Sequence, residues 1–225
     1  ILDNKAVLIK TRNPHKYTVI PKSKLIQEHP GGGGTVAIYW GLDEMRVLKN
    51  LGVKDAPSPI IGRYDWPGQY KPFDHQKTTA AFLTMNRRAF CLNEQGTGKT
   101  GSVIWAADYL LKQKRIRRVL VICPLSIMDS AWRADLFNFA MHRTVDIAHG
   151  ARDKRAKIVT GDAEFIIINY DGLNIVEEEI KKAGFDLIIV DEANTQAFFE
   201  AQREHERLKR QTEEDVLTLK ERERE

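Results

Sequence analysis

The residues best suited to do chemistry in this chain lie in one short stretch, N-E-Q-G-T-G-K-T at positions 93–100. An apolar run at 89–92 precedes this stretch, and a helix-like segment over 101–111 follows it. A strand, a glycine turn and a helix N-terminus in this order form a cradle for phosphate, because the backbone N–H groups and the helix dipole attract an anion there. The sequence therefore predicts a phosphate-binding loop.

Each residue type in this loop has a physical reason to be there. Gly96 and Gly98 allow backbone angles and a close approach that a Cβ would block. Lys99 is expected to reach the β- and γ-phosphates of a nucleotide, and the Thr100 hydroxyl to complete a Mg²⁺ shell. Asn93 occupies a position where such loops usually have glycine. A chance match in a surface loop is the alternative, and the strand before and helix after argue against it. The predicted nucleotide-binding residues of the loop are Gly96, Thr97, Gly98, Lys99 and Thr100.

A second candidate, Asp191–Glu192, follows the apolar run L-I-I-V at 187–190. Asp191 is placed to hold Mg²⁺ through water, opposite Thr100, and Glu192 to polarise the water that attacks the γ-phosphate. Adjacent acids at a strand end are common and could instead cap a helix. Their position about ninety residues after the phosphate loop favours catalysis. The predicted catalytic set is Lys99, Asp191 and Glu192, with Thr100 and Asp191 at the metal.

The elements that must position these residues alternate between helix and strand. The expected strands are continuous apolar runs, which indicates a parallel sheet covered by helices on both faces. We therefore predict a doubly wound α/β fold, in which the working residues lie beyond the carboxyl ends of the strands. The strands are expected at 89–92, 119–123, 145–148, 165–169 and 187–190, and the helices at 74–87, 99–111, 127–140, 152–159 and 175–183.

The two ends of the chain differ in texture from this central part. Short β-rich runs, A-V-L-I-K, Y-T-V-I-P and T-V-A-I-Y-W, are followed by a predicted helix at 42–51, with Gly52 as its stop. Mixed charge dominates the other end and indicates a solvated helix or a disordered tail. The expected organisation is an accessory region with its connector at 1–72, an α/β domain at 73–199 and a tail at 200–225.

Composition sets wider bounds. The 225 residues are 42% hydrophobic and 29% charged, with a net charge of +4, which permits a polyanionic partner without requiring one. Cys91 and Cys123 lie in apolar runs and are expected to be buried, reduced thiols. No apolar run approaches the roughly 18 residues of a membrane helix, and no signal peptide is visible. We expect a soluble intracellular protein, whose natural beginning is missing because the chain opens with Ile1.

Five segments together carry a family resemblance: P-F-D-H-Q at 72–76, the loop at 93–100, V-I-C-P-L-S-I-M-D-S-A-W at 121–132, I-N-Y-D at 168–171 and I-V-D-E-A-N at 189–194. Their order resembles the first, RecA-like motor domain of superfamily-two helicases, and within them the Swi/Snf-type DNA translocases. The C-P-L-S segment and the E-x-G-x-G-K-T pattern of the phosphate loop favour that branch over RNA-directed DEAD-box proteins. The resemblance covers residues 73–194.

The resemblance implies an ATP-driven motor that uses Mg²⁺ and moves on duplex DNA, with Gln76 reading the adenine edge. It also implies that two strand exits lie along the DNA backbone. Asn194 replaces the His that usually ends the family's D-E-A-H motif. The family also has a further S-A-T or T-G-T-P-like segment and a second motor domain, and nothing after Asn194 resembles either. The expected partners are therefore duplex DNA and a second RecA-like domain, with no membrane. The residues expected along DNA are Pro124, Leu125, Ser126, Asn169 and Tyr170.

Two other functions stay open: a non-catalytic nucleotide- or DNA-binding module left by truncation, and an unrelated phosphate-loop enzyme such as a kinase. The D-E-A-N exit and the lack of an acceptor-site signal argue against the kinase. The dense basic cluster at 112–118 is expected at the edge opposite the active face, as a solvated turn. Basic residues near the N-terminus could add phosphate contacts or be scattered surface charge; they are Lys10, Arg12, Lys16, Lys22 and Lys24.

Overall fold

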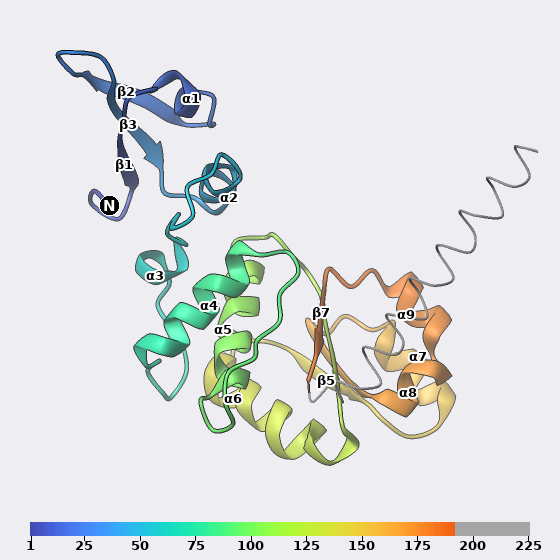
Figure 1. Ribbon diagram of the computed structural model, residues 1–225. Helices are drawn as coiled ribbons and strands as arrows, with labels where there is room; N and C mark the ends of the chain where they lie inside the picture. The colour runs from blue at the N-terminus through green and yellow to red at the C-terminus, as the bar shows by residue number, and fades with distance from the viewer. Residues whose placement is uncertain (192–225) are drawn as a thin grey trace, which may run out of the picture.

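The computed structural model describes residues 1–191, and these form two sheets with helices between and around them (Figure 1). The N-terminal sheet is antiparallel with strand order β1-β3-β2, and the second sheet is parallel with order β5-β6-β4-β7. The strands of the first are β1 (Ala6–Thr11), β2 (Ser23–Glu28) and β3 (Gly34–Tyr39), and those of the second are β4 (Val119–Cys123), β5 (Val145–Ala148), β6 (Phe165–Asn169) and β7 (Leu187–Val190).

The parallel sheet is covered by helices on both faces, which confirms the doubly wound α/β fold. Val121 and Ile167 point to one face, where they pack with Ile104 and Leu136. Alternate residues of the same strands, such as Ile122, point to the other face. Because side chains alternate along a strand, two buried faces require a continuous apolar run. The helices of the first face are α5 (Lys99–Lys112) and α6 (Ala134–Ala140), and those of the second are α7 (Arg152–Val159), α8 (Tyr170–Ile175) and α9 (Glu177–Ala183).

The strand predicted at 89–92 is wrong. This segment lies outside both sheets, and Phe90 and Leu92 are 61% and 85% exposed. An apolar run of four residues becomes a strand only where a neighbouring strand takes up its backbone groups, and the described sheet ends at β7. Cys91 is accordingly half-buried rather than buried, whereas Cys123 is buried as expected; no disulfide joins them.

Two predicted helices are irregular in the structure. The helix expected at 127–140 is a 3-10 turn η1 (Leu125–Ile127), a π-helical segment η2 (Met128–Arg133) and then α6. The wider η2 turn buries Met128 and Trp132 together. The helix expected at 175–183 is α9, which begins at Glu177, and the short helix α8 before it was not predicted. Buried Val176 separates the two, because its backbone angles are not helical.

The N-terminal region has its own core, in which Val36, Ile38 and Trp40 of the β3 segment pack against Met45 and Leu48. The strand predicted from Y-T-V-I-P is wrong. The short helix α1 (His15–Thr18) forms there instead, since Pro14 presets the first turn and accepts its hydrogen bonds. The strand β2 was not foreseen. The remaining helices are α2 (Leu42–Asn50), α3 (Ile60–Arg63) and α4 (Asp74–Met85).

The helix α2 ties this region to the α/β domain. Arg46 donates to the carbonyl oxygen of Thr84 at 2.6 Å, and Lys49 to the amide oxygen of Asn86 at 2.6 Å. The Trp40 indole donates to the carbonyl of Pro57 at 2.8 Å.

None of the helices within residues 1–191 is long and apolar enough to cross a membrane. The predicted tail at 200–225 lies outside the described residues.

Candidate active site

The phosphate loop ends at Gly98, which caps the N-terminus of α5 in the left-handed region at φ +69°. Gly96 is also left-handed, at φ +75°, and a Cβ there would meet nothing within 4 Å. These angles are costly for residues with a Cβ, so both glycines are explained by the backbone path. The 14 residues of α5 align their dipole so that its positive end lies at the loop.

Lys99 lies at the start of α5 and turns back over the loop. Its Nζ donates to the carbonyl oxygens of Asn93 and Glu94, each at 2.9 Å. The Thr97 hydroxyl also donates to the carbonyl of Glu94, at 2.8 Å. Loop carbonyls are weak partners for an ammonium group compared with phosphate oxygens, which carry full charge. The lysine is therefore placed where an anion at the helix N-terminus could take over its hydrogen bonds.

Gln76 lies beside the same loop. Its Nε2 is 3.4 Å from the carbonyl oxygen of Thr97, and its Oε1 accepts from the backbone N–H of Phe73 at 2.9 Å as part of a capping box for α4. A Cβ on Gly98 would lie 2.0 Å from Gln76 Nε2. The structure thus brings Gln76 to the phosphate loop, and its contact with adenine stays a prediction.

Topology places the phosphate loop and Asp191 at the same edge of the sheet. The chain leaves α5 and enters β4 after a short turn, so α5 runs back across the sheet and begins where the parallel strands end. Asp191 follows the last residue of β7, and its backbone N–H donates to Ile122 of β4 at 2.9 Å. Ile104 of α5 and Ile189 of β7 pack in the same core cluster. This agrees with the rule that parallel strands gather functional groups at their carboxyl ends.

Asp191 is held by two aromatic side chains from other strand exits. The Trp132 indole N–H donates to its Oδ2 at 2.7 Å, and the Tyr170 hydroxyl donates to its carbonyl oxygen at 2.6 Å. Trp132 is 1% exposed and comes from η2, which follows β4, whereas Tyr170 follows β6. Three strand exits therefore converge on one residue, Asp191, with Trp132 at its carboxylate and Tyr170 at its backbone carbonyl. Glu192 and Asn194 lie outside the described residues.

The residues expected along DNA differ in accessibility. Leu125 is 56% exposed, Ser126 is exposed and Pro124 is half-buried. Tyr170 is 37% exposed. Asn169 is buried, so the contact predicted between its side chain and DNA stays a prediction that this placement does not favour.

Asn169 instead takes part in a buried polar pair. Its Oδ1 accepts from Nη1 of Arg155 at 2.9 Å, and the same guanidinium donates to the carbonyls of Ala148 and Gly150. Gly172 allows the pair to form, because a Cβ there would lie 2.1 Å from the arginine. Arg155 is thus a structural residue that locks the exits of β5 and β6.

Sequence reasoning missed Trp132 and Arg155 as parts of this edge. Trp132 ends the motif segment at 121–132, nine residues after the last residue of β4, and a large aromatic residue at the end of that motif was a usable signal. Arg155 had no such signal, since only the fold brings it to Asn169.

The residues present fit a nucleotide with Mg²⁺. A helix N-terminus with two left-handed glycines and a lysine suits phosphate, and the Thr100 hydroxyl and the Asp191 carboxylate are hard oxygen ligands. No group of three His, Cys, Asp or Glu suited to an ion lies within residues 1–191. Mg²⁺ held by one or two protein oxygens together with phosphates needs no such group.

The basic cluster at 112–118 is engaged in the structure, away from this site. Lys112 pairs with Asp65 at 2.7 Å, and Arg115 with Asp43 at 2.6 Å. Arg118 donates to backbone carbonyls at the ends of α7 and α9. The expectation of a merely solvated turn is therefore wrong for these three residues, because each has a specific partner.

Comparison with known proteins identifies the family. A model of the SNF2-related domain matches residues 75–214, more than half of the chain. The chain belongs to the SNF2-related domain family. The matched segment includes the phosphate loop and Asp191, and the resemblance to a Swi/Snf-type superfamily-two motor domain is confirmed.

Individual proteins are similar to parts of this SNF2-related domain. The ISWI chromatin-remodeling complex ATPase ISW2 of Saccharomyces cerevisiae is 32% identical over 108 residues, which cover 45% of this chain and 10% of that protein. The Sulfolobus solfataricus SWI2/SNF2 ATPase core in complex with dsDNA is 26% identical with a TM-score of 0.50, over 58% of this chain and 28% of that one. The type ISP restriction-modification enzyme LlaGI, solved with a DNA substrate mimic, is 20% identical with a TM-score of 0.42, over 55% of this chain and 15% of that one. The chain thus spans a small part of the length of its relatives.

Proposed function

We propose that this SNF2-related domain binds ATP with Mg²⁺ at the loop 93–100 and forms the first motor domain of a DNA translocase. The observation that carries the proposal is the common edge at which Lys99, at the start of α5, and Asp191, at the end of β7, are both found. The family match supports ATP as the substrate. The similar Sulfolobus solfataricus ATPase core, solved in complex with dsDNA, supports both ATP as the substrate and duplex DNA as the polymer on which the domain moves.

Each residue has a proposed role at the nucleotide. Lys99 would leave its loop carbonyls to bind the β- and γ-phosphates, and the first N–H groups of α5 would bind the same anion. Thr100 and Asp191 would hold Mg²⁺, which when bound neutralises charge on the phosphate oxygens. Trp132 would orient the Asp191 carboxylate. Glu192 would act as the base for the attacking water.

Hydrolysis and movement are proposed for the domain together with a second RecA-like domain. Leu125, Ser126 and Tyr170 are exposed at the same edge and would lie along the DNA. Tyr170 also donates to the backbone of Asp191, so a shift at the DNA side would reach the nucleotide side through one hydrogen bond.

The nucleotide part is tested with Lys99→Ala and a fluorescent ATP analogue. We expect wild-type protein to bind the analogue with Mg²⁺ and the variant to lose at least about tenfold in affinity, as one or more charge-assisted hydrogen bonds disappear. Lys77→Ala is the matched control, since Lys77 pairs with the exposed Asp74 on the solvent side of α4. Equal affinities of Lys99→Ala and wild-type protein would refute the proposal.

The motor part is tested by adding a second motor domain with its arginine fingers in trans. DNA-stimulated phosphate release that disappears in Lys99→Ala supports the motor. Intact nucleotide binding without such release favours the alternative, a binding module without turnover. Transfer of phosphate to a small molecule instead of water would indicate a kinase.

A further inference from the structure

The N-terminal sheet and its flanking residues carry an excess of positive charge. Residues 1–41 hold six of the chain's 35 Lys and Arg but only two of its 31 Asp and Glu. This segment therefore accounts for the whole net charge of +4, and the rest of the chain is balanced. Most of these cations are exposed, so the question is whether they share a face.

The register of the strands places two of these cations, Lys10 and Lys24, on one face of the sheet. Residues directly opposite one another in antiparallel strands point to the same side of a sheet. Leu8, Ala37 and Lys24 form one row across the three strands, and Lys10, Thr35 and Gln27 form the next. The intervening residues, such as Val36, point inward to the core. Lys10 and Lys24 consequently lie on one outer face, on either side of the small residues Thr35 and Ala37 of β3.

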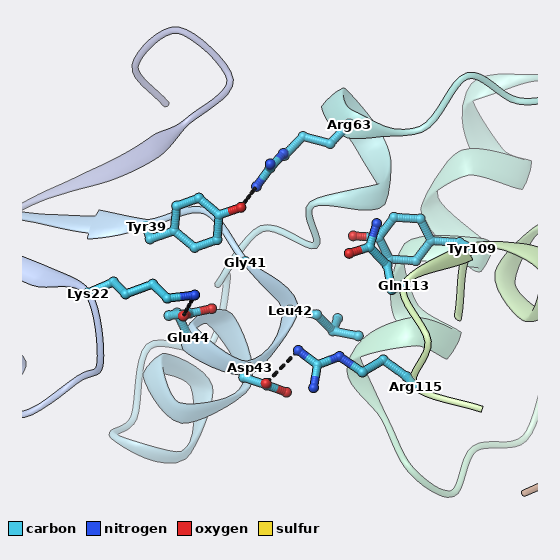
Figure 2. A pocket seen from close by; sticks show the side chains of 10 residues that line it. All are labelled: Lys22, Tyr39, Gly41, Leu42, Asp43, Glu44, Arg63, Tyr109, Gln113 and Arg115. Atoms are coloured by element: carbon cyan, nitrogen blue, oxygen red, sulfur yellow. Dashed lines mark hydrogen bonds and ion pairs between the residues drawn. The ribbon is translucent and has the colours of Figure 1, made fainter. Parts of the chain in front are cut away.

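Two further cations extend this face at the end of β3. The Tyr39 ring has Lys22 Nζ 4.8 Å and the Arg63 guanidinium 4.9 Å from its centroid. Figure 2 shows Arg63 reaching the Tyr39 hydroxyl and Lys22 reaching Glu44 beside it. They line a cavity of about 190 Å³ between the sheet and α5, to which Arg115 adds a third cation and Asp43 and Glu44 the carboxylates.

The cations on the sheet are available to a partner. Lys10 and Lys24 are exposed, and neither forms an ion pair with a carboxylate of residues 1–191. Lys22 is 69% exposed and its only carboxylate in the described chain is Glu44, at 3.6 Å. The helix α2 lies on the inner side, so it fixes the face relative to the α/β domain without covering it (Figure 1).

We propose that this outer face, defined by Lys10, Lys22, Lys24 and Arg63, binds the phosphate backbone of duplex DNA as a second contact beside the motor. A polyanion is favoured because the cations outnumber the carboxylates on the face. Backbone contact is favoured over stacking of single-stranded bases, because the Tyr39 ring, the aromatic group of this face, already has two cations against it. The proposal rests on the proposed function for the identity of the nucleic acid.

The test compares duplex affinity of the whole chain with that of Lys10→Gln/Lys24→Gln across about 50 to 200 mM salt. Each lost phosphate contact lowers the slope of log K against log salt by about 0.9, so the double variant should be shallower by about 1.8. Lys157→Gln/Lys182→Gln, exposed on α7 and α9, removes the same charge elsewhere. Its slope should match that of wild-type protein.

Several results would overturn the proposal. One is an unchanged salt slope in Lys10→Gln/Lys24→Gln, and another is an equal loss of slope in Lys157→Gln/Lys182→Gln. A third is that Lys10→Gln/Lys24→Gln loses binding to anionic lipid vesicles but retains its duplex affinity. Single strands bound more tightly than duplex, with the difference lost in Lys10→Gln/Lys24→Gln, would also overturn it. Nucleotide affinity separates this proposal from the proposed function, because it should fall in Lys99→Ala and stay unchanged in Lys10→Gln/Lys24→Gln.

Discussion

The indole N–H of Trp132 lies 2.7 Å from Oδ2 of Asp191, 59 residues further along the chain. Trp132 belongs to the π-helical segment η2, and such segments are found frequently at functional sites. The segment that begins at Pro124, on the proposed DNA side, is therefore joined directly to the proposed metal-binding carboxylate. The buried indole holds one carboxylate oxygen of Asp191.

Replacement of Trp132 by Phe should weaken the Mg²⁺ dependence of nucleotide binding. Phe retains much of the packing but removes the donor to Asp191, and loss of such an outer partner typically costs about 10-fold or more in metal affinity. The measurement is nucleotide affinity with Mg²⁺ and with EDTA. Only the Mg²⁺-dependent part should fall.

The matched control is Trp105→Phe. Trp105 is also buried and donates to the carbonyl of Pro67 at 2.9 Å; it lies on α5 but packs in another core cluster than Trp132. If both variants lost nucleotide affinity equally, with and without Mg²⁺, the effect would be one of packing, and the positioning role of Trp132 would be rejected.

Gly98→Ala should disrupt the phosphate loop. The new Cβ would meet Gln76 Nε2 at 2.0 Å, and φ of +69° is strained for alanine by about 1 kcal/mol or more. We expect a loss of nucleotide affinity together with a small loss of stability, measured by ligand binding and urea unfolding. Gly52→Ala has the same kind of φ, +99°, with nothing within 4 Å, and should cost stability alone. Equal nucleotide affinity in both variants would contradict the role of Gly98.

Arg118→Ala should destabilise the domain by about 2–3 kcal/mol, because charged hydrogen bonds to backbone carbonyls in a part-buried site are lost. The guanidinium donates to the carbonyls of Val159 and Ala183, where it also complements the C-terminal dipoles of α7 and α9. Urea unfolding measures the change. Its neighbour Arg117, 86% exposed with a 3.9 Å ion pair, should change stability by less than about 0.5 kcal/mol when replaced by Ala. A similar cost for both would show that Arg118 does not act as this cap.

Stability should fall at alkaline pH through two buried tyrosines. Burial raises the pKa of Tyr109 to about 12, and burial together with the neighbouring Asp108 raises the pKa of Tyr64. Tyrosine in the unfolded chain ionises near pH 10. The stabilisation is therefore fully present below pH 10 and is lost as pH rises toward the folded-state pKa.

The measurement is the free energy of unfolding from about pH 9 to about pH 12, with tyrosinate absorbance as a second signal. Tyr109→Phe should flatten the decline. A decline of the same slope in wild-type protein and Tyr109→Phe would exclude Tyr109 as its source.

Local patterns in the chain were sufficient for most of the α/β domain. The four strands of the parallel sheet have the expected bounds, because each is a short run rich in apolar residues. The two central strands, β4 and β6, are buried on both faces, as their continuous apolar runs predict. The loop 93–100 was visible because glycine, lysine and threonine at that spacing follow directly from what phosphate needs. The order of strand exits also follows from chain order and the rule of carboxyl ends.

Tertiary structure decided what depends on partners distant in sequence. The run 89–92 has the composition of a strand but lies outside the sheet, since strand formation needs a neighbour and composition does not supply one. The hydrogen bond from Trp132 to Asp191 and that from Arg155 to Asn169 both join separate elements. The shared face of Lys10 and Lys24 exists only because the register of β3 aligns two strands that the sequence left unpaired. Periodicity records which side of an element is buried, whereas the partner on that side is selected by packing of the whole chain.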